Sequence, residues 1–526
     1  RAALFYFCLE RIMKKIAIIL SIISMSAHSQ HRDNIWMMGI YAAFIPYSNY
    51  YYMDFTNGNP DTVVQYRKMP MYITNASICD TAGNLLFYTN GEWIANADGD
   101  TLLNSQNFNP GYYTQYYSPV GLGFSQAALF LPFSDTSRLY YVVSESAELF
   151  INKDSAYDAQ PFYLTYSIID ASLDSGRGGV LPNAKNINII NDTLLLGRIT
   201  ACKHANGRDW WVVVHKYYSD VYYKLLFTEN GVYGPYTQQI GSLFPAKILT
   251  PFGYDDFDIA GMACFSPDGS KYATVGPSRI MEVLDFDRCT GMFSNAQTVN
   301  IPINPGYNWA LGCSFSPNSR FLYANTYMRG YQYDTYAANI DSSGILVAVY
   351  DSFVDPFQTY FFINQLGPDG KIYLSTWGGN RSLHVIEYPD SLGASCNFNQ
   401  HSYGLPHNNI GNTTVPNLPN YRLGRLVGSA CDTLTNLTYT PQPPKGGVRV
   451  MPNPNNGNFI VSYELPQNTS GKLEIFDING RAVYSQNLPQ WSTLQFISLP
   501  KLSNGVYQCI ITSGNYVTQK KLVVIH

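Results

Sequence analysis

One stretch decides the predicted fold: Cys264-Phe-Ser-Pro-Asp-Gly-Ser-Lys-Tyr-Ala-Thr-Val275. An apolar run leads into a Ser-Pro-Asp-Gly turn, and a run rich in aromatic and β-branched residues leaves it. Proline fixes φ at the first corner, aspartate bonds to its own backbone, and glycine accepts positive φ. The stretch therefore predicts two antiparallel strands joined by a tight turn.

This unit is repeated along the chain. Close copies occupy Cys313–Tyr323 and Gln365–Leu374, and looser ones occupy Cys79–Tyr88, Phe133–Val143 and Cys202–Val214. The turn prolines Pro267, Pro317 and Pro368 are 50 and 51 residues apart. A period near 50 with about four strands in each unit is typical of a β-propeller.

Residues 30–425 are long enough for about seven blades, with six or eight allowed, at roughly 50–60 residues a blade. Only some of the blades show the turn, so we expect strands from both ends of this region to share the last blade. The candidate strands lie in Trp36–Phe44 and His401–Leu405. The alternative fold is an array of β-sandwiches in which the turns recur by accident.

Composition supports an all-β chain and excludes several classes of protein. The 526 residues include 33 basic and 37 acidic side chains against 43 Tyr, 28 Phe and 7 Trp, and the net charge is −4. This excess of aromatic over charged residues excludes a disordered or coiled-coil chain. The weak negative charge excludes a basic footprint for nucleic acid.

The first 29 residues have the layout of processing signals. Met13 is the expected start, and two lysines and the apolar run Ile16–Ile23 follow it. Small residues then precede a predicted signal-peptide cleavage before Gln30. Because the apolar run is shorter than the roughly 20 residues of a membrane span, we predict no transmembrane span in the mature protein.

Four cysteines lie four to six residues before the turn glycine or its equivalent Ser319: Cys79, Cys202, Cys264 and Cys313. We expect them on the same strand of different blades, near the propeller axis, as packed free thiols. The functional alternative is a ring of metal ligands or a set of disulfides. Cys289 and Cys396 are expected in equivalent hairpin loops. Export permits disulfides, but the spacing assigns no pair.

The composition changes after Leu426. Residues 426–447 form a predicted linker, because Thr433–Gly447 is poor in apolar residues and rich in Thr, Asn, Pro and Gly. Short alternating segments then fill residues 448–526, and they predict a small C-terminal β-sandwich after the propeller.

Several spaced motifs define this tail: Pro452, Asn453, Pro454, Phe459, the Phe476–Arg481 hairpin with Gly480 and Arg481, Gly505, Tyr507, Lys520 and Lys521. In these positions residues 448–526 resemble the type A C-terminal sorting domain of the Bacteroidetes type IX secretion system. The resemblance implies that the leader directs export and that the tail engages the type IX secretion machinery. The product would then be released or attached to surface lipopolysaccharide.

The repeat region resembles the WD40/YVTN-like β-propellers carried by such secreted proteins. Three stretches carry this resemblance: Cys79–Gly91, Phe286–Gly291 and Leu418–Gly424. The resemblance implies a fold and a cellular address, and it implies no particular activity.

Catalytic motifs are absent from the sequence. It contains no His-Glu-x-x-His, no phosphate-binding Gly-Lys loop and no dinucleotide fingerprint. Gly123–Ala127 only half resembles a nucleophile elbow around Ser125, because the second glycine is missing. His204 and His215 flank a pair of tryptophans and are expected to pack in the core or at its rim. No catalytic or cofactor-binding residue is assigned.

Two groups of oxygen-bearing side chains are candidate metal sites. Asp255, Asp256 and Asp258 form the densest acidic group of the repeat region, and Asn96, Asp98 and Asp100 alternate along the chain. Calcium prefers such ligands. A solvated loop explains the first group and a hairpin turn the second, so calcium stays an alternative and the metal sites stay unknown.

Tyrosines occur in runs beyond what alternating strands require, at Tyr50–Tyr52, Tyr112–Tyr117 and Tyr217–Tyr223. On loops between blades they would form an aromatic platform for glycan or protein contacts. On strands they would pack blade against blade. The sequence leaves both interpretations open.

The favoured function is a secreted or surface-attached propeller that binds an extracellular protein or glycan without catalysis. The alternative is a secreted propeller hydrolase or lactonase with its site at one mouth of the central channel. Propellers support both classes, so the fold alone does not choose between them.

Overall fold

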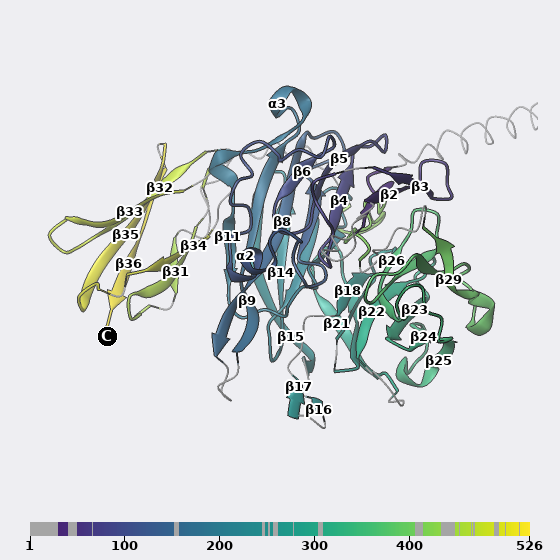
Figure 1. The fold of residues 1–526 in the computed structure, drawn as a ribbon. Coiled ribbons are helices and arrows are strands. Elements are labelled where there is room, and N and C mark those ends of the chain that lie inside the picture. The colour runs from purple at the N-terminus through teal and green to yellow at the C-terminus, as the bar shows by residue number, and fades with distance from the viewer. Residues whose placement is uncertain are drawn as a thin grey trace, which may run out of the picture.

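The computed structural model describes residues 30–39, 50–151, 157–244, 248–250, 253–255, 261–302, 309–405, 414–432 and 448–525, apart from positions 66, 277, 452, 464, 467–468, 489–493, 500 and 515. The regular secondary structure of the described residues is almost entirely β-strand (Figure 1). The predicted signal peptide lies outside them, as does Thr433–Gly447, the greater part of the predicted linker.

Seven sheets form the blades of a β-propeller, and within most of them the strands follow chain order from the axis outward. Blade 1 contains β1 (Ile35–Met38), β2 (Tyr51–Asp54) and β3 (Asp61–Val64), and blade 2 contains β4 (Ala76–Cys79), β5 (Leu85–Thr89) and β6 (Ile94–Asn96). Blade 3 contains β7 (Ala128–Pro132), β8 (Leu139–Ile151), β9 (Tyr157–Asp170), β10 (Gly179–Val180) and β11 (Ile187–Asn191).

The other four blades have four strands each. Blade 4 contains β12 (Thr200–Lys203), β13 (Trp210–His215), β14 (Ser219–Thr228) and β15 (Gly231–Phe244), and blade 5 contains β18 (Met262–Phe265), β19 (Lys271–Val275), β20 (Ile280–Phe286) and β21 (Phe293–Asn300). Blade 6 contains β22 (Ala310–Phe315), β23 (Phe321–Thr326), β24 (Arg329–Asp334) and β25 (Ile345–Val349), and blade 7 contains β26 (Phe361–Leu366), β27 (Ile372–Thr376), β28 (Ser382–Ile386) and β29 (Phe398–Gly404).

Short elements lie in the connections between these strands. They are the hairpin of β16 (Ile248–Thr250) and β17 (Gly253–Asp255), the helices α2 (Tyr112–Tyr117) and α3 (Leu173–Gly176), and the 3-10 turns η1 (Pro182–Ala184), η2 (Asp341–Ser343) and η3 (Gly393–Cys396). Inner strands of neighbouring blades contact each other, as β4 contacts β1 and β7, and β22 contacts β18 and β26.

The six repeat turns all join the inner strand of a blade to its second strand. In each one the N–H of the fourth residue donates to the carbonyl of the first, and the pairs are Gly83 to Asp80, Ser137 to Ser134, Gly207 to His204, Gly269 to Ser266, Ser319 to Ser316 and Gly370 to Gly367. Gly269 has φ +73 and Ser319 has φ +65, which explains why glycine is the usual residue there. The predicted propeller is thus confirmed.

Closure of the ring differs from the prediction of a shared blade, which is wrong for the described strands. Blade 1 is built from the N-terminal β1, β2 and β3, whereas β29 pairs with β28 in blade 7. The two blades meet through side chains: the Tyr403 hydroxyl lies 2.7 Å from the Thr62 hydroxyl, and Trp36 packs edge-on against Tyr373 with ring centroids 5.7 Å apart. Figure 1 shows β2 and β3 beside β26 and β29.

A C-terminal segment, residues 414–432, ties the ring together, and we call it the strap. Its bonds reach residues of blades 2, 3, 4, 5 and 7 and the residues that precede β1 of blade 1. They join Thr414 to the Ile73 carbonyl, Asn417 to Ala128 and Ile199, Asn420 to Pro267, Tyr421 to Phe130, and Arg422 to Pro368 and Asp33. The end of the propeller region therefore helps to close the ring as a strap across the channel and not as a strand of a blade.

A disulfide fixes the end of the strap. Cys431 is bonded to Cys289, which lies in the hairpin between β20 and β21 of blade 5, across a sequence separation of 142 residues. Cys396 lies in the corresponding connection of blade 7, between β28 and β29, and its thiol is free and buried. The two cysteines thus occupy equivalent loops, as the sequence predicts.

The C-terminal tail is a two-sheet sandwich. One sheet contains β30 (Arg449–Met451), β31 (Asn458–Ser462) and β34 (Leu494–Ser498), and the other contains β32 (Gly471–Phe476), β33 (Ala482–Leu488), β35 (Gly505–Ser513) and β36 (Tyr516–Val524). Its core lies between the sheets and includes Phe459 and Val461 from the first and Leu473, Cys509 and Leu522 from the second. Alternating residues of each strand face this core, which is why the alternation in the sequence predicts it.

Candidate functional site

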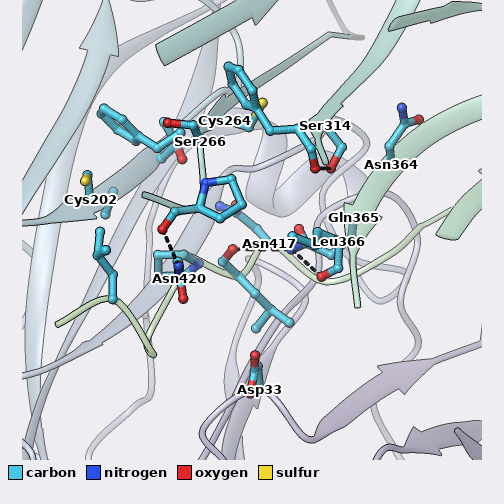
Figure 2. A pocket seen from close by; sticks show the side chains of 18 of the residues that line it. Asp33, Cys202, Cys264, Ser266, Ser314, Asn364, Gln365, Leu366, Asn417 and Asn420 are labelled. Carbon is cyan, nitrogen blue, oxygen red and sulfur yellow. Dashed lines mark hydrogen bonds between the residues drawn. The ribbon is translucent and has the colours of Figure 1, made fainter. Parts of the chain in front are cut away.

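A cavity of about 270 Å³ lies on the propeller axis, at the side of the repeat turns (Figure 2). The turn prolines Pro267, Pro317 and Pro368 line it together with strap residues Asn417 and Asn420. The Asn420 side chain donates to the Pro267 carbonyl at 2.7 Å. The strap therefore forms one wall of the cavity.

The cavity wall combines apolar side chains with neutral polar ones. Its amides, hydroxyls and thiols are those of Gln126, Asn364, Gln365, Asn417, Asn420, Thr200, Ser266, Ser314, Cys202, Cys264 and Cys313. Among the described residues that line it, only Asp33 and Arg422 are charged, and they form an ion pair at 2.8 Å. Burial raises the pKa of Asp33, while the neighbouring Arg422 guanidinium opposes that rise.

Cysteines line the cavity where the sequence predicts them. Cys79, Cys202, Cys264 and Cys313 all lie on inner strands, and the last three reach the cavity wall. Burial raises the pKa of the Cys202 thiol to about 12. At neutral pH this side chain is a thiol, and so it is not an activated nucleophile.

The other sequence candidates for catalysis are packed. Ser125 is fully buried and its hydroxyl donates to the Gly261 carbonyl, so the half-elbow presents no open nucleophile. His204 accepts a hydrogen bond from the Asn206 N–H through Nδ1 and lies 3.1 Å from the Cys289 carbonyl through Nε2. These contacts hold a loop in place, and they do not form a catalytic arrangement.

The structure describes all of one candidate group of metal ligands and only Asp255 of the other. Asn96 and Asp100 close a hairpin, in which the Gly99 N–H donates to the Asn96 carbonyl and Lys68 pairs with Asp100 at 2.8 Å. Asp255 ends β17, and Asp256 and Asp258 lie outside the described residues. Within the part of the chain that the structure describes, no three His, Cys, Asp or Glu side chains gather as a metal site. The calcium alternative stays a prediction.

Two histidines are buried as neutral rings. Burial lowers the pKa of His215 to about 3, and it does the same for His384. His215 packs edge-on against Tyr222 with ring centroids 4.3 Å apart, and His384 Nε2 lies 2.9 Å from the Thr359 carbonyl. Both therefore have structural positions, as the sequence predicts for His215.

These histidines predict an acid sensitivity. Unfolding returns each pKa from about 3 to the ordinary 6.5, so below pH 6.5 the unfolded chain binds more protons than the folded one. The stability they contribute is complete above pH 6.5 and is lost as the pH falls towards 3. We expect the free energy of unfolding to fall by about 1.4 kcal/mol per pH unit for each ring. Urea unfolding between pH 7 and pH 5 measures this, and a flat profile would contradict it.

Some tyrosines of the three runs are buried by packing, and others are exposed to solvent. Tyr51 and Tyr222 are fully buried on strands, and the Tyr223 hydroxyl donates to Asp192. Tyr112 and Tyr116, in contrast, are 41% and 66% exposed on α2, in the connection between blades 2 and 3. Tyr217 and Tyr218 are half-buried between β13 and β14 of a single blade, so α2 is the run that presents exposed rings between blades.

Helix α2 gathers four tyrosines on one short turn of helix. The spacing of four residues puts Tyr112 above Tyr116 and Tyr113 above Tyr117. The Tyr112 and Tyr116 rings are nearly parallel, at 17°, with centroids 6.0 Å apart, and Tyr113 and Tyr117 lie 5.4 Å apart. We call these four residues the tyrosine cluster.

Hydrogen bonds of Thr114 and packing of the Tyr117 ring hold the tyrosine cluster against its neighbours. Buried Thr114 donates to the Asn109 carbonyl at 2.7 Å and lies 2.8 Å from the Ser146 hydroxyl of β8. The Tyr117 ring covers Gly123, where a Cβ would clash with it. Burial raises the pKa of Tyr117 to about 12. The helix that carries the exposed rings is therefore attached to its neighbours by hydrogen bonds and ring packing.

The tail motif residues form two groups. Asn453 donates to the Lys521 carbonyl at 2.7 Å, and its side-chain oxygen accepts from the Val523 N–H at 2.8 Å, so it holds the closing strand β36. The side chains of Lys520 and Lys521 on this strand are exposed. Pro454 follows Asn453 through a cis peptide bond, and Pro452 lies outside the described residues.

The second group borders a groove of about 440 Å³ lined by Arg481, Val483, Leu499, Lys501, Leu502, Ser503 and Tyr507. Gly480, with φ +75, closes the hairpin before Arg481, and Arg481 pairs with Asp477 at 3.3 Å. Gly505 begins β35, and the Tyr507 hydroxyl donates to the Ser503 carbonyl at 2.9 Å. Arg481 and Tyr507, far apart in sequence, therefore share one groove.

The strap was missed as a structural and cavity-forming element. Leu418–Gly424 resembles part of the secreted propellers, but its local pattern is neither helical nor strand-like, and its bonding partners are distant in sequence.

Among the described residues no helix combines the length and apolarity that a membrane crossing needs.

Comparisons with known proteins give a fold likeness for most of the chain and a family for its tail. No curated protein matches the chain. It is similar to a candidate 6-phosphogluconolactonase from Bacteroides uniformis ATCC 8492, with 12% identity, 88% of this chain and 98% of that chain covered, and a TM-score of 0.34. It is also similar to the β-propeller domain of Myceliophteria thermophila Cps50 (Swd1), with 10% identity, 66% and 94% covered, and a TM-score of 0.31. A third match is the Dos1 propeller, with 11% identity, 66% and 87% covered, and a TM-score of 0.34.

Such TM-scores say nothing about what this chain binds or converts. Residues 449–525 match the family described as the secretion system C-terminal sorting domain, and with this tail the chain is exported to the cell surface or the extracellular space.

Proposed function

We propose that this chain is an exported, non-catalytic binding propeller whose tyrosine cluster recognises a glycan. The observation that carries the proposal is the pair of exposed, nearly parallel rings of Tyr112 and Tyr116, 6.0 Å apart on a helix whose Thr114 contacts Ser146 of β8. Tyrosine combines a broad apolar face with a hydroxyl group and has few side-chain torsions to order.

A glycan fits this surface better than a charged ligand. The C–H faces of sugar rings pack on aromatic rings, while sugar hydroxyls need hydrogen-bond partners at the edge. Gln115 lies on the same exposed helix, and the Glu148 carboxylate accepts from the Tyr112 N–H at 3.3 Å, so polar groups stand beside the rings. No basic cluster accompanies the tyrosines on α2, whose six residues are Tyr, Thr and Gln.

The screen for the ligand uses the full protein collected after export. We expect it to retain a defined class of saccharides on a glycan array. A protein partner captured instead, with no glycan retained, would contradict the glycan assignment. Turnover of lactones or esters by the same preparation would favour the alternative, a propeller hydrolase with its site at the axial cavity.

The sorting tail gives a separate prediction about where the protein is located. Deleting residues 448–526 is expected to leave the protein in the periplasm, because the type IX machinery would have no tail to engage. Cell fractionation and protease treatment of intact cells measure this. The control is Lys472→Gln, which removes a charge on β32 away from the tail motif residues. This variant should leave export intact. Surface display of the deleted form would contradict the assignment.

A further inference from the structure

Two thiols meet beside the axial cavity. Cys264 lies on β18 of blade 5 and Cys313 on β22 of blade 6, and their sulfur atoms are 3.6 Å apart. Both side chains line the cavity, where Cys264 is half-buried and Cys313 is buried. The separation is van der Waals contact between sulfur atoms that belong to different blades.

The pair is distinct from the other free cysteines of the described residues. Cys202 lines the same cavity but packs against the Lys203 and Gly269 carbonyls, at 3.6 and 4.0 Å. Cys79, Cys396 and Cys509 are buried away from the cavity. The cavity admits water-sized molecules, so Cys264 is open to a small reagent that would not reach those three.

The setting of the chain favours oxidation. The protein is exported, and disulfides persist outside the cytoplasm. The same chain already carries the Cys289–Cys431 disulfide. A disulfide needs sulfur atoms about 2.05 Å apart, so the two sulfur atoms, now 3.6 Å apart, must approach by about 1.6 Å for a bond to form.

We propose that Cys264 and Cys313 are a modification site at which peroxide forms a second disulfide, between blades 5 and 6. The Cys264 sulfur attacks hydrogen peroxide, breaks the O–O bond and becomes a sulfenic acid, and one water leaves. The Cys313 sulfur then attacks the Cys264 sulfur, the S–O bond breaks, and the hydroxyl leaves with the Cys313 proton as a second water. Two thiols are oxidised by two electrons and one peroxide is reduced to two waters.

The rate has an expected dependence on pH. The hydrogen bond with Cys313 and burial raise the pKa of the Cys264 thiol well above its ordinary value. Because the thiolate is the reactive form, oxidation is expected to be slow at neutral pH and to quicken as the pH rises.

Peptide mapping of the full exported protein tests the proposal. The protein is treated with hydrogen peroxide, alkylated without reduction and digested with both trypsin and chymotrypsin, since trypsin alone leaves Cys289 and Cys313 on residues 289–320. We expect a linked pair of peptides containing Cys264 and Cys313, with Cys79, Cys396 and Cys509 alkylated as free thiols. A link already present before treatment would also support the proposal.

Two results would overturn it. One is full alkylation of Cys264 and Cys313 after peroxide treatment. The other is a separate sulfinic acid on Cys264 with no link to Cys313. A Cys313→Ser variant gives a second measurement, because its Cys264 should be trapped as a sulfenic acid by a dimedone reagent. If that variant does not fold, the mapping of the unaltered chain decides the question by itself.

Discussion

Replacing Cys289 with serine is expected to lower the free energy of unfolding by about 5 kcal/mol, because the Cys289–Cys431 bond closes a loop of 142 residues. Without it the unfolded chain gains the conformations that the cross-link forbids. In the folded state the same bond holds the strap on blade 5, and the Leu426 N–H of the strap donates to the Ala205 carbonyl of blade 4 at 2.8 Å. Urea unfolding of the two proteins measures the difference.

The matched control for this variant is Cys396→Ser. Cys396 lies in the equivalent connection of blade 7, is buried, and forms no disulfide. Its loss removes one small buried contact and is expected to cost about 1 kcal/mol. Equal losses in the two variants would mean that the disulfide contributes nothing beyond the local packing of a sulfur atom.

Asn417→Ala is expected to cost about 3 kcal/mol, from hydrogen bonds that no other side chain replaces. The Asn417 amide donates to the Ala128 carbonyl at 3.0 Å and to the Ile199 carbonyl at 2.9 Å, and its oxygen accepts from Gln126 at 3.2 Å. Alanine would leave these partners buried next to a small void. Thermal and urea unfolding give the change in free energy.

Asn420→Ala is the control for the strap. Asn420 is half-buried, and its side chain makes one bond to a blade, to the Pro267 carbonyl. We expect a loss of about 1 kcal/mol, in line with a single hydrogen bond. If Asn420→Ala destabilised the protein as much as Asn417→Ala, the strap would act through its overall presence rather than through the amide that joins blades 3 and 4.

The blades could be predicted because their information is local. Ser266–Gly269 and its copies form a turn whose chemistry lies within four residues, and the spacing of the copies gives the blade. The alternation in Leu473–Ile475 and Cys509–Ile511 likewise predicts a sandwich, because each residue's face follows from its neighbours. Cys264 and Cys313 were placed near the axis by the same reasoning.

The closure of the ring could not be predicted, since it depends on partners far apart in sequence. The strap has no period, and Asn417 finds its partners only after blades 3 and 4 exist. Spacing alone could not pair Cys289 with Cys431, since any cysteine of the exported chain was an equal candidate. Tyr112–Tyr117 was ambiguous for another reason: six residues are too few for a helical period to stand out.

The titration of the tyrosine cluster tests the central claim most directly. The best saccharide from the array is titrated by calorimetry into the exported protein, into a Tyr112→Ala/Tyr116→Ala variant, and into Tyr336→Ala as the control. Tyr336 is 63% exposed and lies outside the cluster. We predict that the double variant binds about a hundredfold more weakly, from roughly 1.4 kcal/mol for each ring, with Tyr336→Ala unchanged. Equal affinity in all three proteins would contradict the account.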